Sequence, residues 1–360
     1  MNTIYLSAED EKTPILAAEM IKSGELVAIP TETVYGLGAN ALDPAASASI
    51  FEAKGRPQDN PLIIHLDSPD KIEQYCQPEG NAYLPKIRPF MPGPITAVLK
   101  KRACIPDVVT ANLESVGVRI PSHPVAHAFL ELCGVPVAAP SANLSGRPSP
   151  TCARHVIDDL YGKVDVILAA GESNVGLEST IVSLVTDPPT LLRPGGITYE
   201  MLCGALGEVA VSSAVLSEMK PGDTAVAPGM KYKHYAPRTP VFLVVGEDEK
   251  VLAFLKEKQA EGHCAILCFS EDVPSLGKEL VADIGAKEDA ALHAHRIFAA
   301  LRDTDEIPEL QSVYVHITED KSGLNLAVFN RLLKASAYHI LNVSPRKKQN
   351  RNKKGQKRKC

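Results

Sequence analysis

The sequence predicts an α/β protein made of two domains. The chain has 360 residues, 45% of them hydrophobic, which is enough for two cores because a domain usually takes about 100 to 200 residues. Over residues 1–215, short apolar runs alternate with helical patterns, and several runs stop at polar residues. Over residues 241–344 strands and helices alternate regularly, which indicates a smaller, Rossmann-like parallel α/β domain.

The first elements are marked by ordinary start and stop signals. Segment 13–24 begins with Thr-Pro and ends in glycine, which predicts a helix with Thr13 as its N-cap. Segment 43–55 begins with Asp-Pro and ends in Lys-Gly, which predicts a second helix. Between them, an apolar strand at 26–29 runs into Pro-Thr-Glu-Thr-Val-Tyr-Gly-Leu-Gly, where hydroxyls and a carboxylate adjoin glycines. An isolated polar turn would look similar, but comparable polar segments follow later strands, so we interpret this one as part of a site.

The remaining elements of the first domain are expected to be short. Strands are predicted at 62–66, 95–99, 117–120, 135–139, 164–168 and 181–185. Helical segments are predicted at 69–76 and 82–90, with a further helix opened by Ser122 and Pro124 and closed by Gly134.

Residues 216–240 are expected to form an ordered linker between the domains. Its part from 221 to 240 has no periodicity and much Pro and Gly, but Tyr232, Lys233, His234 and Tyr235 are unlike a simple spacer. We therefore expect the linker to lie against the rest of the protein. Beyond it, strands are predicted at 241–245, 264–269 and 313–317, and helices at 250–259, 289–301 and 324–336.

Composition and charge exclude some classes of function. No apolar run approaches the roughly 20 residues of a membrane span, and the N-terminus lacks a signal peptide, so we expect a cytoplasmic protein without membrane contact. Residues 345–360 carry nine Lys and Arg and no acid, which leaves 29 basic against 43 acidic residues in 1–344. A body this acidic is not a general nucleic-acid binder. The basic tail is expected to be disordered, although it could contact RNA or an acidic partner.

Cations and hydroxyls gather at the ends of the expected strands. The cations are Lys54, Arg56, His65, Arg119 and Arg193, and the hydroxyls are those of Ser141, Ser149 and Ser179. This set suits a polyphosphate together with a carboxylate, because guanidinium groups bind both bidentately. Alternatively these are unrelated surface residues, with Lys54 and Arg56 stabilising a helix C-terminus. Spacing alone does not decide between the two interpretations.

The usual nucleotide-binding motifs are missing from the sequence. Gly36-Leu37-Gly38 followed by Ala41 nearly fits the dinucleotide fingerprint, but the helix predicted at 43–55 starts too late for it. No Walker A loop and no metal-ligand cluster occurs. A nucleotide would have to be bound by residues other than a glycine-rich phosphate-binding loop.

Longer motifs carry a family resemblance. In order along the chain they are PTETVYGLGANA, KGRPQDNPLIIHL, GPITAVL, VGVRIPSHP, PSANLSGRPSPT, GLESTIVSL and LRPGGIT. Together they resemble the signature segments of the YrdC/TsaC-like L-threonylcarbamoyladenylate synthases, with Lys54/Arg56 and Ser141/Asn143 matching that family's KxR and SxN patterns. The linker and the domain after it resemble the long, two-domain branch. The resemblance implies a twisted mixed sheet with helices for the first domain.

The resemblance also implies a reaction. L-threonine, bicarbonate or carbon dioxide, and ATP with Mg²⁺ would give threonylcarbamoyl-AMP and pyrophosphate. A TsaD-type transferase would then move the threonylcarbamoyl group to adenosine 37 of tRNA. By matching motif, threonine would be held by Thr33, His65, Arg119, Ala139 and Ser179. ATP would be held by Arg56, Asn60, Ser115, Ser141, Ser149, Arg193 and Tyr232, and the catalytic set would be Lys54, Arg56, Ser141 and Asn143.

The chemistry of the implied reaction favours positioning over general-base catalysis. The carbamate of threonine is easily lost, so it must meet the α-phosphorus quickly and away from water. We expect Lys54, Arg56, Arg193 and a Mg²⁺ carried by ATP to neutralise charge on the phosphates. The linker around Tyr232 to Tyr235 would close over the site as a lid. Deleting 221–240 should then leave threonine binding largely intact but abolish adenylate formation.

The alternative from a different class is an RNA-binding module. The first domain would then offer a concave basic surface, and the tail from Arg346 to Lys359 would add phosphate contacts. That alternative predicts salt-dependent RNA affinity that is lost with the tail. The motifs favour the enzyme.

Overall fold

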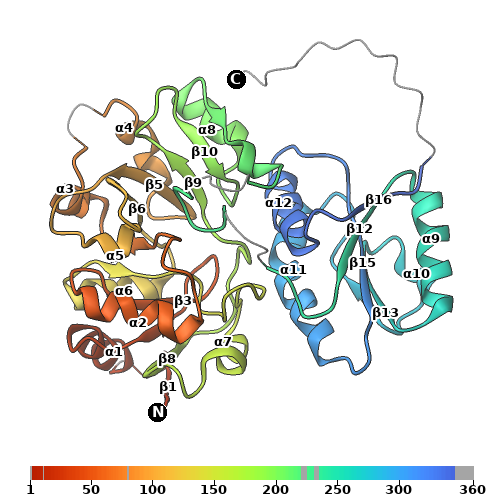
Figure 1. Ribbon diagram of the computed structural model, residues 1–360, viewed down its shortest axis with the longest axis horizontal. Coiled ribbons are helices and arrows are strands. Elements are labelled where there is room, and N and C mark those ends of the chain that lie inside the picture. The colour runs from red at the N-terminus through yellow and green to blue at the C-terminus, as the bar shows by residue number, and fades with distance from the viewer. Residues whose placement is uncertain (1, 11, 79–80, 220–224, 231–234, 345–360) are drawn as a thin grey trace.

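The computed structural model describes residues 2–10, 12–78, 81–219, 225–230 and 235–344. Within this part of the chain, two α/β domains lie side by side, each around its own sheet (Figure 1). The first sheet ends with residues 210–211 and the second begins at residue 241. The expected α/β class is therefore confirmed. Tyr232 and the basic tail 345–360 lie outside the described residues.

The first domain is built on a mixed sheet of eleven strands among the described residues. Their spatial order is β1-β8-β2-β3-β7-β4-β6-β5-β9-β10-β11. The strands are β1 Ile4–Ser7, β2 Val27–Ile29, β3 Gly36–Asn40, β4 Ile63–His65, β5 Ile95–Lys100, β6 Ser115–Arg119, β7 Val137–Ala138, β8 Val166–Ala169, β9 Thr180–Ser183, β10 Thr190–Arg193 and β11 Ala210–Val211. Most strands are short, and five of them, β2, β4, β7, β8 and β9, are buried along their whole length.

Short helices cover this sheet. They are α1 Thr13–Lys22, α2 Pro44–Lys54, α3 Ile72–Tyr75, α4 Leu84–Ile87, α5 Asp107–Thr110, α6 Pro124–Cys133, α7 Ala153–Leu160 and α8 Tyr199–Leu206, with 3₁₀ turns η1 Pro69–Lys71, η2 Arg88–Phe90 and η3 Ser213–Val215. Helix α2 has the predicted ends: the Asp43 carboxylate accepts the amides of Ala45 and Ala46, and Gly55 closes the helix at a φ of 60°.

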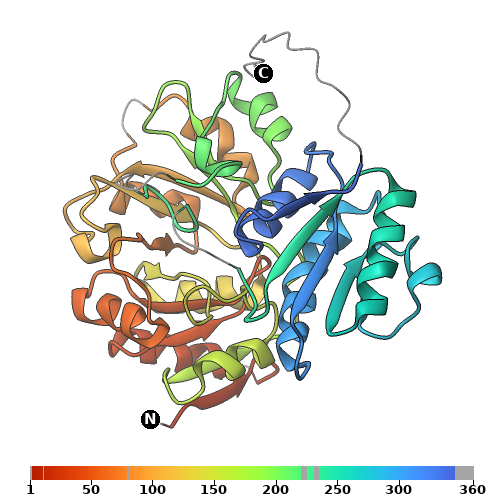
Figure 2. The same cartoon turned by 45° about the vertical axis from the view of Figure 1, so that its right-hand side comes forward.

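The second domain is a parallel sheet of five strands with the order β14-β13-β15-β12-β16. The strands are β12 Val241–Val245, β13 Cys264–Cys268, β14 Val281–Asp283, β15 Ser312–His316 and β16 Ile340–Asn342, and the helices are α9 Asp248–Glu261, α10 Val273–Leu276, α11 Ala290–Asp303 and α12 Asn325–Ala335, with the 3₁₀ turn η4 Thr304–Glu306. Helices α11 and α12 lie on the face toward the first domain, and α9 and α10 on the other face (Figures 1 and 2).

The structure corrects several expected details. Thr13 is the first residue of α1 and not its cap, because the N-cap is Lys12, which makes no side-chain capping bond. Helix α6 is capped by the His123 ring and not by Ser122. The glycines of 36–38 belong to strand β3, antiparallel to β2, which explains why they do not form a dinucleotide loop. Within the described ranges, none of the helices has both the length and the hydrophobicity of a membrane span.

Candidate active site

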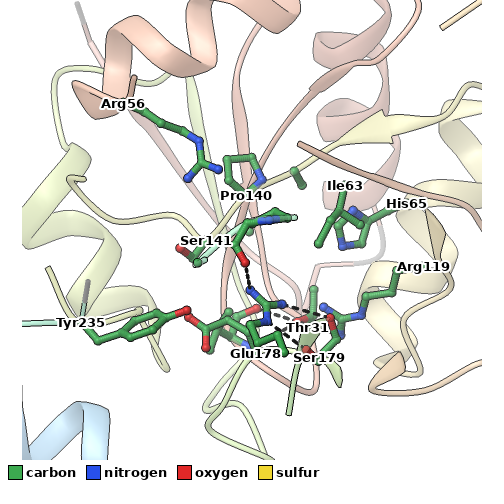
Figure 3. Close-up of a pocket in the computed structure, with 16 residues that line it drawn as sticks. Thr31, Arg56, Ile63, His65, Arg119, Pro140, Ser141, Glu178, Ser179 and Tyr235 are labelled. Atoms are coloured by element: carbon green, nitrogen blue, oxygen red, sulfur yellow. Dashed lines mark hydrogen bonds between the residues drawn. The ribbon is translucent and has the colours of Figure 1, made fainter. Parts of the chain in front are cut away.

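One pocket lies where the ends of several first-sheet strands meet the connection to the second domain (Figure 3). Its free space, including solvent at the mouth, is about 540 Å³. The lining residues are Thr31, Val34, Gly36, Arg56, Ile63, His65, Arg119, Ala139, Pro140, Ser141, Glu178, Ser179, Arg193, Pro228, Gly229 and Tyr235. Seven of the residues predicted from sequence are among them.

Strand register brings His65 and Arg119 together. Strands β4 and β6 are parallel, and the two residues are register partners at the carboxyl ends of these strands. Arg119 is buried, and its Nη2 lies 2.8 Å from Glu32 Oε1 and 3.5 Å from Thr31 Oγ1. Because Glu32 takes up one edge of the guanidinium and the Arg119 Nε has no partner, the group keeps donor capacity for a ligand carboxylate.

His65 is neutral at the edge of this pocket. Burial, and next the positive charge of Arg119, lower the pKa of His65 to about 3. Its Nδ1 is buried without a hydrogen-bond partner. An unpaired ring nitrogen on a neutral imidazole can donate a hydrogen bond to a polar ligand such as an amino acid, or accept one from it, depending on the tautomer.

The lowered pKa of His65 predicts a loss of stability in acid. The unfolded chain binds a proton at this histidine below pH about 6.5, whereas the folded chain does not until about pH 3. The contribution of His65 to the free energy of unfolding is therefore complete above pH 6.5 and falls as the pH drops toward 3, by up to about 1.4 kcal/mol per pH unit. Denaturant unfolding of the protein and of His65→Gln at several pH values measures this slope.

The expected result is a shallower loss between pH 6.5 and 5 in His65→Gln than in the unmodified protein. The exposed His263 supplies the control, since His263→Asn should keep the original slope. Parallel pH profiles for the protein and His65→Gln would contradict the neutral assignment.

A second group of polar residues surrounds Ser179. Its hydroxyl lies 2.8 Å from Thr96 Oγ1, because β5 and β9 are parallel neighbours. Arg193, from the end of β10, donates from Nε to the Ser179 carbonyl at 3.1 Å and from Nη2 to the Ser179 hydroxyl at 3.3 Å. Its Nη1 reaches the Pro228 carbonyl at 3.4 Å. Burial lowers the pKa of Arg193, so this cation is held in a site of low polarity.

Arg56 and Ser141 form the wall opposite, at the loop after α2 and the loop after β7. Arg56 donates to the carbonyls of Asn60 and Pro61 at 3.1 to 3.3 Å. Burial lowers the pKa of Arg56 to about 10. The Ser141 hydroxyl donates to the Asn143 side-chain oxygen at 2.5 Å. Three arginines, Arg56, Arg119 and Arg193, therefore face one pocket and make it attractive to anions.

Lys54 and Asn143 shape this wall and are not among the pocket-lining residues. The Lys54 ammonium is buried and donates to the Ser141 carbonyl at 2.5 Å and to the Asn143 carbonyl. Burial, followed by the charge of Arg56, lowers its pKa well below the usual value. Asn143 donates to the carbonyls of Leu144 and Arg147. In this structure, Lys54 thus fixes the loop that presents Ser141.

Four other predicted residues also lie outside the lining. Thr33 is buried behind Thr31, with their hydroxyl oxygens 2.9 Å apart. Asn60 is buried, and its side-chain oxygen has no partner. Ser115 is half-buried at the end of β6 opposite to Arg119, and Ser149 reaches the pocket through Glu178. Their roles, like that of Tyr232, stay predictions.

Three residues that the sequence did not predict, Glu32, Thr96 and Glu178, also hold the site together. Glu178 is buried, its Oε1 accepts from the Ser149 hydroxyl, and its Oε2 lies 2.7 Å from Nε of Arg331. Burial opposes ionisation, but Arg331, Arg193 and the Ser149 hydroxyl together keep the pKa of Glu178 below its usual value. The available signal was a carboxylate within an otherwise apolar and hydroxyl-rich segment, in both Thr-Glu-Thr and Leu-Glu-Ser-Thr.

The chain is similar to known proteins over most of its length. Residues 19–195 match the family described as telomere recombination, and residues 197–337 match the family described as threonylcarbamoyl-AMP synthase, C-terminal domain. The chain is 46% identical over 338 residues to the threonylcarbamoyl-AMP synthase of Pyrococcus abyssi, covering 91% of this chain and 95% of that protein. It is 39% identical over 330 residues to the enzyme of that name from Bacillus subtilis, covering 90% and 93%.

Solved structures show the same two-domain architecture. The crystal structure of P. abyssi Sua5 complexed with L-threonine superposes with a TM-score of 0.87 at 42% identity, covering 96% of this chain and all of that one. The structure of its H234A/Y235A variant gives a TM-score of 0.88 at the same identity, covering 95% and 98%. The similarity therefore spans both domains.

Proposed function

Because this chain belongs to the threonylcarbamoyl-AMP synthase family, we propose that it makes threonylcarbamoyl-AMP and pyrophosphate from L-threonine, bicarbonate or carbon dioxide, and ATP. One observation carries the proposal. One pocket is lined by His65 and Arg119, which would form an amino-acid half, and by Arg56, Ser141 and Arg193, which would form a phosphate half. The relative solved with L-threonine supports the first half.

Threonine would bind with its carboxylate on Arg119. The Glu32 carboxylate holds the guanidinium in place from one side, so the group does not have to be ordered when threonine arrives. Neutral His65 would form a hydrogen bond with the amine or hydroxyl of threonine. Because the ring carries no charge, it would not repel the ammonium group of threonine. The Ser179 hydroxyl and the small Ala139 would complete this half of the pocket.

ATP would bind with its phosphates between Arg56 and Arg193. The two carboxylates beside the pocket, Glu32 and Glu178, are each paired with an arginine. We therefore propose that Mg²⁺ enters on the phosphates of ATP, where it would neutralise their charge, and not on a set of protein ligands. Within the described residues, no cluster of three or more His, Cys, Asp or Glu is arranged to hold a metal.

The reaction would proceed in two steps, formation of a carbamate and its transfer to the α-phosphorus of ATP. The neutral amine of threonine adds to carbon dioxide with loss of a proton, or to bicarbonate with loss of water, and forms a carbamate. A carbamate oxygen then attacks the α-phosphorus of ATP, and the bond to the β-phosphate oxygen breaks to release pyrophosphate. Arg56 and Arg193 would stabilise the charge on the transferring and leaving phosphates.

The product would be passed on for tRNA modification. A mixed anhydride of a carbamate and AMP hydrolyses easily, so we propose direct use by a TsaD-type transferase in the cytoplasm. The relation of this step to the basic tail 345–360 stays a prediction, because the tail lies outside the described residues.

The experiment is pyrophosphate release from ATP, with and without L-threonine and bicarbonate. We expect release that needs both co-substrates and falls about 10²- to 10³-fold in Arg56→Ala, as for the loss of one preorganised donor to a developing charge. Arg88→Ala, at an exposed arginine paired with Asp70, is the control and should be fully active. Turnover of ATP that ignores threonine would contradict the proposal.

A further inference from the structure

Helix α12 of the second domain carries three buried polar side chains toward the first domain. Asn330, Arg331 and Lys334 are 2%, 0% and 4% exposed, although they belong to a domain whose own core lies on the other side of the helix. Figure 1 shows α12 at the boundary between the two domains. Buried charges are costly unless they are paired, so the partners of these side chains identify what α12 holds in place.

Arg331 forms an ion pair with Glu178, which lines the pocket. Its Nε donates to Glu178 Oε2 at 2.7 Å, and its Nη2 donates to the Glu178 carbonyl at 3.2 Å. The other carboxylate oxygen of Glu178 accepts from the Ser149 hydroxyl. A charged group of the second domain therefore fixes, through one pocket-lining residue, a serine predicted to hold ATP.

Lys334 and Asn330 hold the connection between the domains. The Lys334 ammonium donates to the Gly229 carbonyl and lies 3.4 Å from the Met230 carbonyl. Asn330 Nδ2 donates to the Val215 carbonyl at 2.7 Å. Gly229 lines the pocket at a φ of 79°, and a Cβ there would lie 2.6 Å from the Tyr235 hydroxyl. The connection is thus packed tightly at the point where Lys334 holds it.

We propose that Arg331 and Lys334 are positioning residues of the active site, through which the second domain sets the ATP half of the pocket. Arg331 acts through Glu178 on Ser149, and Lys334 acts through the backbone of Gly229. Among the described residues, no hydrogen bond joins α12 to the side chains of Arg119 or His65 in the threonine half. This inference rests on the proposed function, because it concerns the ATP substrate of that reaction.

The test compares two arginines that join the same domains in the full-length protein. Arg331→Met removes the partner of Glu178. Arg154→Met removes an ion pair with Glu306 of the second domain, and neither Arg154 nor Glu306 lines the pocket. We expect Arg331→Met to raise the KM for ATP at least tenfold and to leave the Kd of L-threonine, measured by calorimetry, within twofold. Arg154→Met should change the KM for ATP less than threefold.

Two further measurements distinguish a loss of ATP binding from misfolding of the variant and from a failure of the proposed reaction. If Arg331→Met does not fold, the double variant Arg331→Met/Glu178→Gln removes both charges and should fold while keeping the weakened ATP binding. Calorimetry with a non-hydrolysable ATP analogue reports on the same contact even if the protein releases no pyrophosphate, so a failure of the proposed reaction would be recognised separately. Equal effects of the two arginine variants, or unchanged binding of the analogue in Arg331→Met, would overturn the inference.

Discussion

Arg119→Met is expected to abolish threonine-dependent pyrophosphate release and to destabilise the protein. The substitution removes the proposed donor for the threonine carboxylate, so the KM for threonine should rise by a factor of about 100 or more. It also leaves Glu32, 6% exposed, as an uncompensated buried charge. Loss of one member of a buried pair typically costs about 3 to 5 kcal/mol of unfolding free energy.

The double variant Arg119→Met/Glu32→Gln separates the two effects. Removing the second charge should restore most of the stability, because no unpaired carboxylate remains, but it should not restore threonine binding. Denaturant unfolding and calorimetry with L-threonine measure the two quantities independently. Threonine affinity that returns together with stability would show that Arg119 acts only on the fold.

The local signals of the sequence predicted those elements whose ends are fixed by their own residues. Helix α2 is the clearest case, because Asp43 caps its first turn and Gly55 closes it, as their residue types require. Strand β3 was missed, since its five residues include two glycines and pair with β2 and β7 only through the tertiary fold. Strands β10 and β14 were missed as well, because segments of four and three residues carry too little local signal and form strands only by pairing with their neighbours.

The candidate site divides in a similar way. Arg56, His65, Arg119 and Arg193 were expected at strand and helix ends, and all four line the pocket. Lys54 was expected near the phosphates, but its residue type gave no indication that the backbone carbonyls of Ser141 and Asn143 surround it. The bond between Glu178 and Arg331 joins residues 153 positions apart, so nothing local in the sequence could predict it.

The loop that delivers Glu178 depends on a close approach between the domains. Gly176 has a φ of 77°, and a Cβ at this position would lie 2.4 Å from the His295 Cα and 2.6 Å from the Ala294 carbonyl oxygen. Helix α11 of the second domain therefore packs directly against glycine backbone. One residue earlier, the Val175 amide donates to the main-chain carbonyl of Glu32 at 2.8 Å, so this loop is also tied to the backbone of the other acidic residue of the site.

Gly176→Ala is accordingly expected to disturb domain docking and the active site together. The alanine adds about 1 to 2 kcal/mol of left-handed backbone strain, and the clash with α11 has to be relieved by moving the helix or the loop. Gly171→Ala is the matched control, because Gly171 has a φ of 73° but nothing within 4 Å of the added Cβ, so only the strain applies. Thermal unfolding should show a distinctly larger loss for Gly176→Ala, and pyrophosphate release should fall at least tenfold in that variant alone. Equal losses in both variants would mean that the contact between Gly176 and α11 does not support the site.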